Sequence, residues 1–155
     1  MLIREATRQD AAALARMRWD FTAEDDFIHP DATHEVYETG FAAFLDRALA
    51  SGQWAIWVVE HEERLVAHIF MQIIEKVPRP GREERRFGWI TNVYTLPEYR
   101  NQGVGSRLME RVVEWAQAHN LELMIVWPTQ RSVPYYKRAG FEYSIEVLQH
   151  PLDEY

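Results

Sequence analysis

The sequence predicts one mixed α/β (α+β) domain, with a central sheet of about six to seven strands flanked by about four helices. Three observations lead to this prediction. The chain has 155 residues, which suits a single domain over 1–155 with a real core. Apolar residues make up 47% and charged residues 26%, a balance typical of globular proteins. Strand-like and helix-like segments follow one another in an order that mixes helices among strands.

The N-terminal third is predicted to contain a short strand at 2–6 and a first helix at 8–20. An acidic loop at 22–32 then leads to a second helix at 33–51. Thr7 and Asp10 have the spacing of a capping box, which predicts the start of the first helix. Thr33 is expected to cap the second helix, and Gly52 to end it.

The remaining strands are predicted from β-branched and aromatic runs, at residues 54–60, 65–74, 87–95, 121–127 and 141–148. The first two form a hairpin across the polar residues 61–64, and the Pro/Gly/Arg segment 77–86 is a longer loop. A helix begins after Gly103, where apolar residues recur at helical spacing. A shorter helix over 131–139 stops at Gly140.

Charge and the absence of cysteine exclude several classes of protein. A net charge of −7 argues against a nucleic-acid binder, which needs a clustered basic surface. Without cysteine there is no disulfide framework, thiolate metal site or cysteine nucleophile. The six histidines show no paired metal-ligand spacing, so no metal is predicted. His68, in an apolar strand, is the histidine to test for a buried hydrogen bond.

Hydropathy bears on location. Charges appear by Arg4 and Glu5, so the first residues do not form the apolar region of a signal peptide. The longest apolar runs, such as 54–59 and 69–71, are too short to cross a bilayer. The protein is therefore predicted to be cytoplasmic, with no membrane partner.

A strand, a turn, two glycines and a helix start follow one another over 90–108. Glycines at a helix start let backbone amides approach an anion, because no Cβ atom stands in the way. The amides of 102–106 can therefore converge on a phosphate at the positive end of the helix dipole. The spacing matches neither the P-loop of nucleotide hydrolases nor the dinucleotide fingerprint. Spacing alone leaves an ordinary turn before a helix as an equal alternative.

Two motifs resemble those of the GNAT N-acetyltransferase superfamily. The first is VYTLPEYRNQGVGSRL at 93–108, similar to the family's Arg/Gln-x-x-Gly-x-Gly/Ala pattern after a strand. The second is SVPYYKRAGF at 132–141, similar to the family's aromatic-Tyr-x-x-x-Gly-Phe element. One helix and one strand separate them, as in the family. The resemblance covers nearly the whole chain, and it implies the GNAT fold and acetyl-CoA as acyl donor.

The resemblance also implies roles for individual residues. Val93 and Thr95 offer backbone groups to the pantetheine arm, with Tyr94 between them. The backbone amides at the helix start hold the pyrophosphate, and these belong to Asn101, Gln102, Gly103, Val104, Gly105 and Ser106. Arg100 either balances charge there or lies in solvent. Tyr136 matches the tyrosine that protonates the departing CoA thiolate, because a phenol stays protonated at neutral pH. Tyr135 is expected to pack.

Two positions depart from the family pattern. Thr129 stands where many members carry asparagine, and it is a helix-cap candidate instead. Many members carry a glutamate base on the strand at 89–92, where this chain has Trp89, Thr91 and Asn92. The base is therefore left open among a water molecule and the side chains of Glu24, Asp25, Asp26, Glu75 and His29.

The predicted activity is direct transfer of an acetyl group from acetyl-CoA to a primary amine of a small molecule or peptide. A non-catalytic CoA- or acyl-CoA-binding sensor is the alternative, because the strand glutamate is missing. The residues at 20–52 and 75–88 are expected to line the acceptor site. Trp19 and Trp127 are expected to pack in the core rather than reach it. The acceptor, an acyl group larger than acetyl and a homodimer are left open.

Overall fold

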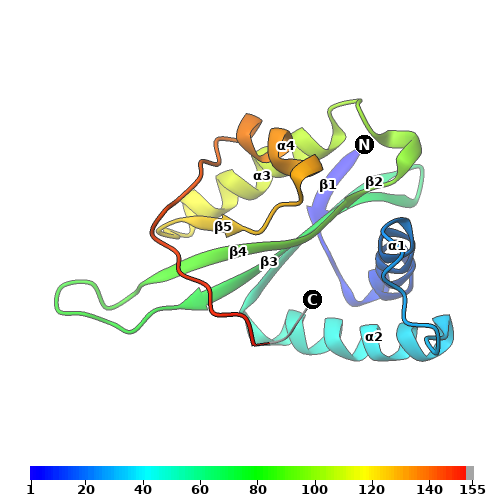
Figure 1. The fold of residues 1–155 in the computed structure, drawn as a ribbon, viewed down its shortest axis with the longest axis horizontal. Helices are drawn as coiled ribbons and strands as arrows, with labels where there is room; N and C mark the ends of the chain where they lie inside the picture. The colour runs from blue at the N-terminus through cyan, green and yellow to red at the C-terminus, as the bar shows by residue number, and fades with distance from the viewer. Residues whose placement is uncertain (153–155) are drawn as a thin grey trace.

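The structure, a computed structural model, describes residues 1–152, so the last three residues of the predicted domain lie outside the described part. A mixed sheet with the strand order β1-β2-β3-β4-β5 forms its centre (Figure 1). The strands are β1 (Leu2–Glu5), β2 (Trp54–His61), β3 (Arg64–Glu75), β4 (Arg86–Thr95) and β5 (Met124–Val126). β1 to β4 are antiparallel neighbours, and β5 runs parallel to β4.

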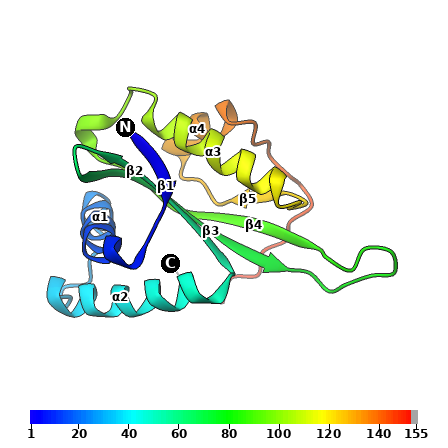
Figure 2. The ribbon, with the colours of Figure 1, turned by 180° about the vertical axis from the view of Figure 1, so that it is seen from behind.

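Helices cover both faces of this sheet. They are α1 (Ala11–Glu24), α2 (His34–Ser51), α3 (Val104–Ala118) and α4 (Val133–Arg138). Seen from the two opposite sides in Figures 1 and 2, α1 and α2 lie together on one face, while α3 and the short α4 lie on the other. No helix of the described part is long and apolar enough to cross a membrane. The arrangement confirms the predicted mixed fold with four helices.

The predicted helix boundaries hold at both ends of α2. The Thr33 hydroxyl accepts a hydrogen bond from the Val36 amide at 3.4 Å, and Gly52 ends the helix with a φ of 68°. At the first helix, the Asp10 carboxylate accepts from the Thr7 amide at 2.7 Å. A short 3-10 turn at Arg8–Asp10 precedes α1, which continues to Glu24 and so shortens the predicted loop.

Two hairpins build the middle of the sheet. β2 pairs with residues 64–72 of β3, and only Glu62 and Glu63 lie between the paired residues His61 and Arg64. β3 and β4 are joined by residues 76–85, which extend away from the body of the molecule (Figures 1 and 2). This segment is part of the range 75–88 that was predicted to help line the acceptor site.

Within residues 1–152 the strand count is lower than predicted, with five strands in place of six to seven. Residues 141–148 do not form a strand, and 121–127 contribute only Met124–Val126. A strand forms only where a neighbouring edge supplies hydrogen bonds. Residues 141–148 alternate in polarity but pair with no strand of the described residues, and Ile145 is 98% exposed.

Candidate functional site

A cleft opens where β4 and β5 part. The two strands pair only over Gly88–Ile90 and Met124–Val126, and β4 then continues alone to Thr95. Residues Thr91 to Thr95 line the resulting cavity, which has a volume of about 380 Å³. Pro128 follows β5 closely, and a proline has no amide hydrogen to continue a ladder. The predicted strand at 93–95 therefore lies in an open cleft.

A β-bulge lies in the middle of the cleft wall. Tyr94 pairs with His68 and Thr91 with Phe70, so Asn92 and Val93 together face one residue of β3. Asn92 adopts a φ of 48°, in the left-handed region that asparagine tolerates better than most residues. A bulge bends the strand and interrupts its ladder. Backbone groups at 92 and 93 are therefore presented differently from those of a regular strand.

The other walls come from distant parts of the chain. The end of α1 contributes Phe21, Glu24 and Asp25, and the chain after β5 contributes Trp127, Thr129, Arg131, Ser132 and Tyr136. The predicted residues Val93, Tyr94, Thr95, Arg100 and Tyr136 thus share one cavity. Residues 101–106 form the start of α3, beyond the part of the cleft that Arg100 lines.

The start of α3 has the geometry of an anion site. Gly103 has a φ of 76°, and its carbonyl accepts the hydrogen bond of the Arg107 amide at 3.1 Å. The amides of residues 104–106 precede that bond and have no partner within the helix. A Cβ atom on Gly105 would lie 3.5 Å from Thr95 Oγ1, so the helix approaches β4 closely here. Tyr135 packs against the same glycine and donates a hydrogen bond to its carbonyl at 2.9 Å.

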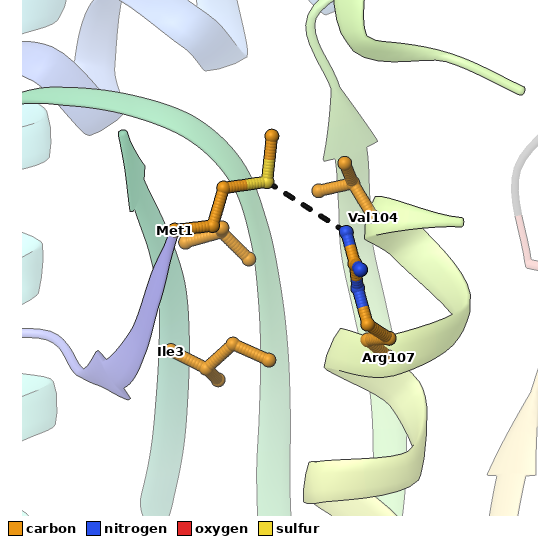
Figure 3. Close-up of a pocket in the computed structure, with 5 residues that line it drawn as sticks. Met1, Ile3, Val104 and Arg107 are labelled. Atoms are coloured by element: carbon orange, nitrogen blue, oxygen red, sulfur yellow. Dashed lines mark hydrogen bonds between the residues drawn. The ribbon is translucent and has the colours of Figure 1, made fainter. Parts of the chain in front are cut away.

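The side chain of Val104 fixes this helix start from the other side. It is 3% exposed and faces Met1 and Ile3 across a separate hollow of about 330 Å³ (Figure 3). Arg107 reaches across the same hollow to the Met1 sulfur at 3.8 Å (Figure 3). The side chain of Val104 thus packs inside the protein, and only the backbone amide of this residue is available to a ligand.

Arg100 is neither free nor directed at the helix start. Its Nη2 donates to the Glu24 carboxylate at 2.9 Å, and its Nε donates to the Thr95 carbonyl at 2.9 Å. The Tyr94 hydroxyl donates to the same carboxylate at 2.6 Å. Burial raises the pKa of Glu24, but the hydrogen bonds from Tyr94 and Arg100 outweigh this effect and lower the pKa. Arg100 therefore ties the end of β4 to α1.

Tyr136 lies at the inner end of the cleft and is 7% exposed. Its ring packs edge-on against Phe141 at 5.5 Å and against Tyr135 at 5.0 Å. Burial raises the pKa of Tyr136 to about 12, so the phenol stays protonated at neutral pH. Among residues 1–152 no group forms a hydrogen bond with its hydroxyl, which leaves the proton available to a ligand.

The candidate bases are separated by the fold. Glu24 and Asp25 line the cleft, and Asp25 lies 4.0 Å from Arg131. Asp26, Glu75 and His29 are not among the residues that line the cleft. Thr129 serves as the cap predicted for it, because its hydroxyl accepts from the Ser132 amide at 3.3 Å.

Several cleft residues were not predicted. Trp127 was expected in the core, but it is 63% exposed and packs edge-on against Trp89 at 5.0 Å in the cleft wall. Phe21 stacks on Tyr94 at 5.2 Å. Their positions depend on where β4 and β5 separate and on where α1 ends. Local sequence patterns predict neither of these two features. Trp19, by contrast, packs against Tyr37 as expected.

The fold and this cleft define the class of protein. The profile of the Acetyltransferase (GNAT) family matches residues 13–141, which is most of the chain. The chain therefore belongs to the Acetyltransferase (GNAT) family, as its two motifs predicted.

Individual relatives share the fold or part of the sequence. An uncharacterized N-acetyltransferase of Archaeoglobus fulgidus is 36% identical over 69 residues, which make up 44% of each protein. The match thus spans less than half of that relative. A predicted acetyltransferase of Clostridium acetobutylicum, solved with acetyl-CoA, has a TM-score of 0.79 at 24% identity and covers 97% of this chain and 96% of its own. Glucosamine-6-phosphate N-acetyltransferase of Arabidopsis thaliana has a TM-score of 0.75 at 16% identity, with 98% of each chain covered. These structures share the fold.

Proposed function

We propose that the protein transfers an acetyl group from acetyl-CoA to a primary amine of a small molecule or peptide, by direct attack in a ternary complex. The observation that carries the proposal is that Thr91–Thr95 and Tyr136 line one cavity, and that Gly105 at the start of α3 lies close to Thr95. Membership of the acetyltransferase family supports the reaction class. The sequence also predicts a cytoplasmic location.

The donor would lie along these residues. The pyrophosphate suits the amides of 101–106, because the helix start provides unpaired donors and nothing lies within 4 Å of a Cβ atom added to Gly103. The pantetheine arm suits the backbone of Val93 and Thr95, since β5 does not pair with this part of β4. An acetyl-CoA-bound relative from Clostridium acetobutylicum supports acetyl-CoA as the donor. An acyl group larger than acetyl is also compatible with this proposal.

Tyr136 would supply the proton for the leaving sulfur. When the amine attacks the thioester carbonyl, the C–S bond breaks and the electron pair stays on sulfur. A phenol with a pKa of about 12 is a weaker acid than a free thiol, which alone would disfavour the transfer. A thiolate in the same dry cleft loses hydration as well, so its pKa rises and the difference narrows. The hydroxyl thus stabilises the thiolate first as a hydrogen-bond donor.

The acceptor would enter near the end of α1. Glu24 and Asp25 are the carboxylates that line this side of the cleft, where they pair with Arg100 and Arg131. Glu24 is a poor base, because Tyr94 and Arg100 already occupy its carboxylate. We therefore assign removal of the amine proton to water, with Asp25, which lines the cleft and lies 4.0 Å from Arg131, as the carboxylate that could receive the proton.

The test is an acceptor screen with acetyl-CoA, in which free CoA is measured with a thiol reagent and the product mass is determined. We expect CoA release that depends on a primary amine and a product heavier by one acetyl group. Binding of acetyl-CoA without release for any amine would favour the sensor function instead. Isolation of a stable acetylated form of the protein would contradict direct attack.

A further inference from the structure

The bulge in β4 is held by two side chains from other elements. The imidazole Nδ1 of His68 on β3 bonds to the backbone carbonyl of Asn92 at 2.8 Å. Arg18 on α1 donates from Nη1 to the side-chain oxygen of Asn92 at 3.2 Å. We call His68, Arg18 and Asn92 the bulge clamp. It secures both the backbone and the side chain of a residue in the left-handed region, with a φ of 48°.

The tautomer of His68 follows from its partner. A carbonyl oxygen only accepts, so Nδ1 carries the proton and Nε2 bears a lone pair. The ring is 0% exposed between Phe70 and Tyr94, and burial lowers the pKa of His68 to about 4. The imidazole is therefore neutral at physiological pH and remains a fixed donor to the bulge.

This arrangement has a cost that packing does not explain. Nε2 of His68 is buried without a hydrogen-bond partner in the described part of the chain. The neighbouring residues of β3 are apolar, among them Ala67, Ile69 and Phe70, so an apolar side chain would suit the site better for stability alone. A buried histidine with one unpaired nitrogen indicates a task for the other nitrogen.

That task lies in the cleft, where Asn92 and Val93 form part of the wall. Under the proposed function the pantetheine arm lies along this strand, so that its thioester end can meet the Val93 amide, which would polarise the thioester carbonyl. Such a donor works only if it is held in place before the reaction, since a small displacement weakens the bond to the developing oxyanion. The carbonyl of Asn92 and the amide of Val93 belong to one planar peptide unit, so fixing the carbonyl also fixes the amide.

We propose that His68 is a positioning residue, which holds the Asn92–Val93 peptide in the orientation needed to polarise the thioester carbonyl. This inference rests on the proposed function. His68 touches no substrate in this role and acts only through the peptide that it binds. It therefore predicts a loss in turnover and little change in donor binding.

The first test compares kinetics of three variants with the acceptor identified by the screen. His68→Leu removes the donor at similar volume, and we expect kcat to fall about 10- to 100-fold while KM for acetyl-CoA changes less than about threefold. His68→Asn places an amide donor near the position of Nδ1 and should recover most of kcat. His119→Leu is the matched control, because His119 Nδ1 bonds to the Trp115 carbonyl at the same 2.8 Å outside the cleft.

The second test reads the peptide itself and needs no turnover. In 1H–15N spectra of the full chain, His68→Leu should shift the amide of Val93, and His119→Leu should leave it unchanged. An unchanged chemical shift of the Val93 amide in His68→Leu would overturn the proposal, and so would an unchanged kcat. A further outcome is that His68→Leu and His68→Asn lose kcat equally, and only in proportion to their loss of folded protein. That outcome would contradict the proposal and show that His68 has a structural role alone. If the wild type releases no CoA with any amine, the proposed function fails, and the spectra alone decide whether the clamp exists.

Discussion

Removing the hydroxyl group of Tyr136 tests the proposed chemistry most directly. We expect Tyr136→Phe to lower kcat about 100-fold, because the leaving thiolate loses its hydrogen-bond donor, with KM for acetyl-CoA nearly unchanged. Steady-state kinetics of CoA release provides the measurement. Tyr143→Phe serves as control, since Tyr143 is 75% exposed. Full turnover in Tyr136→Phe would remove the proton-donor role.

His68 gives the protein a specific sensitivity to acid. Its pKa is about 4 in the folded protein and about 6.5 in the unfolded chain. Below pH 6.5 the unfolded chain therefore binds a proton that the folded protein does not. The free energy of unfolding should fall as the pH drops from about 6.5 to about 4, by up to about 3 kcal/mol, and then level off with respect to this group.

Urea unfolding across this pH range checks the prediction. Asp10 and Glu24 also have lowered pKa values, but they contribute equally to the wild type and to His68→Leu. The difference between the two proteins therefore isolates His68, and the variant should show a shallower loss of stability. Parallel curves from pH 6.5 to pH 4 would mean that the imidazole is not buried.

At the scale of single elements, the start of α3 can be tested with a matched pair of glycines. Gly103 and Gly52 have nearly the same left-handed backbone, with φ values of 76° and 68°, and neither has a neighbour within 4 Å of an added Cβ atom. A glutamate at either position should cost about 1 kcal/mol of stability. Only Gly103→Glu should weaken acetyl-CoA binding, by about tenfold or more, because its charge faces the pyrophosphate. Calorimetric titration would reveal equal affinities if the helix start were not the phosphate site.

The turn between β2 and β3 carries a strain that can be relieved. Glu62 and Glu63 have positive φ values of 50° and 61°, the signature of a turn in which asparagine and glycine are preferred. Replacing them by Asn and Gly should raise the free energy of unfolding by about 1 kcal/mol. The same change at Glu83 and Glu84, whose φ values are ordinary, should bring no gain. Denaturant midpoints of both variants provide the comparison.

At the scale of the whole molecule, the segment after α4 adds little to the core. Ile145 and Leu148 are each 98% exposed. Changing both to serine should alter the free energy of unfolding by less than about 0.5 kcal/mol, whereas Leu108→Ala, at a residue 1% exposed, should cost about 2–5 kcal/mol. A stability loss in the serine variant that depends on protein concentration would indicate that a second copy covers this segment, and light scattering would then detect the homodimer.

Local signals in the sequence were sufficient for most elements. The caps at Thr33 and Gly52 and the apolar stripe after Gly103 define helix ends, because the required contacts lie within a few residues. The hairpin of β2 and β3 follows from two β-rich runs separated by a short polar turn. The strand predicted at 141–148 was wrong because a strand depends on pairing with another strand, and no local sequence pattern reveals that partner.

The sequence by itself determined the family, and it predicts a donor loop at 100–106 and a role for the tyrosine at 136, because these depend on residue types at fixed short spacings. The tertiary structure decided what those residues face. Arg100 pairs with Glu24, Trp127 enters the cleft wall, and His68 holds the bulge at Asn92. Each of these contacts joins residues far apart in the chain, and only the packing of the helices and strands brings them together.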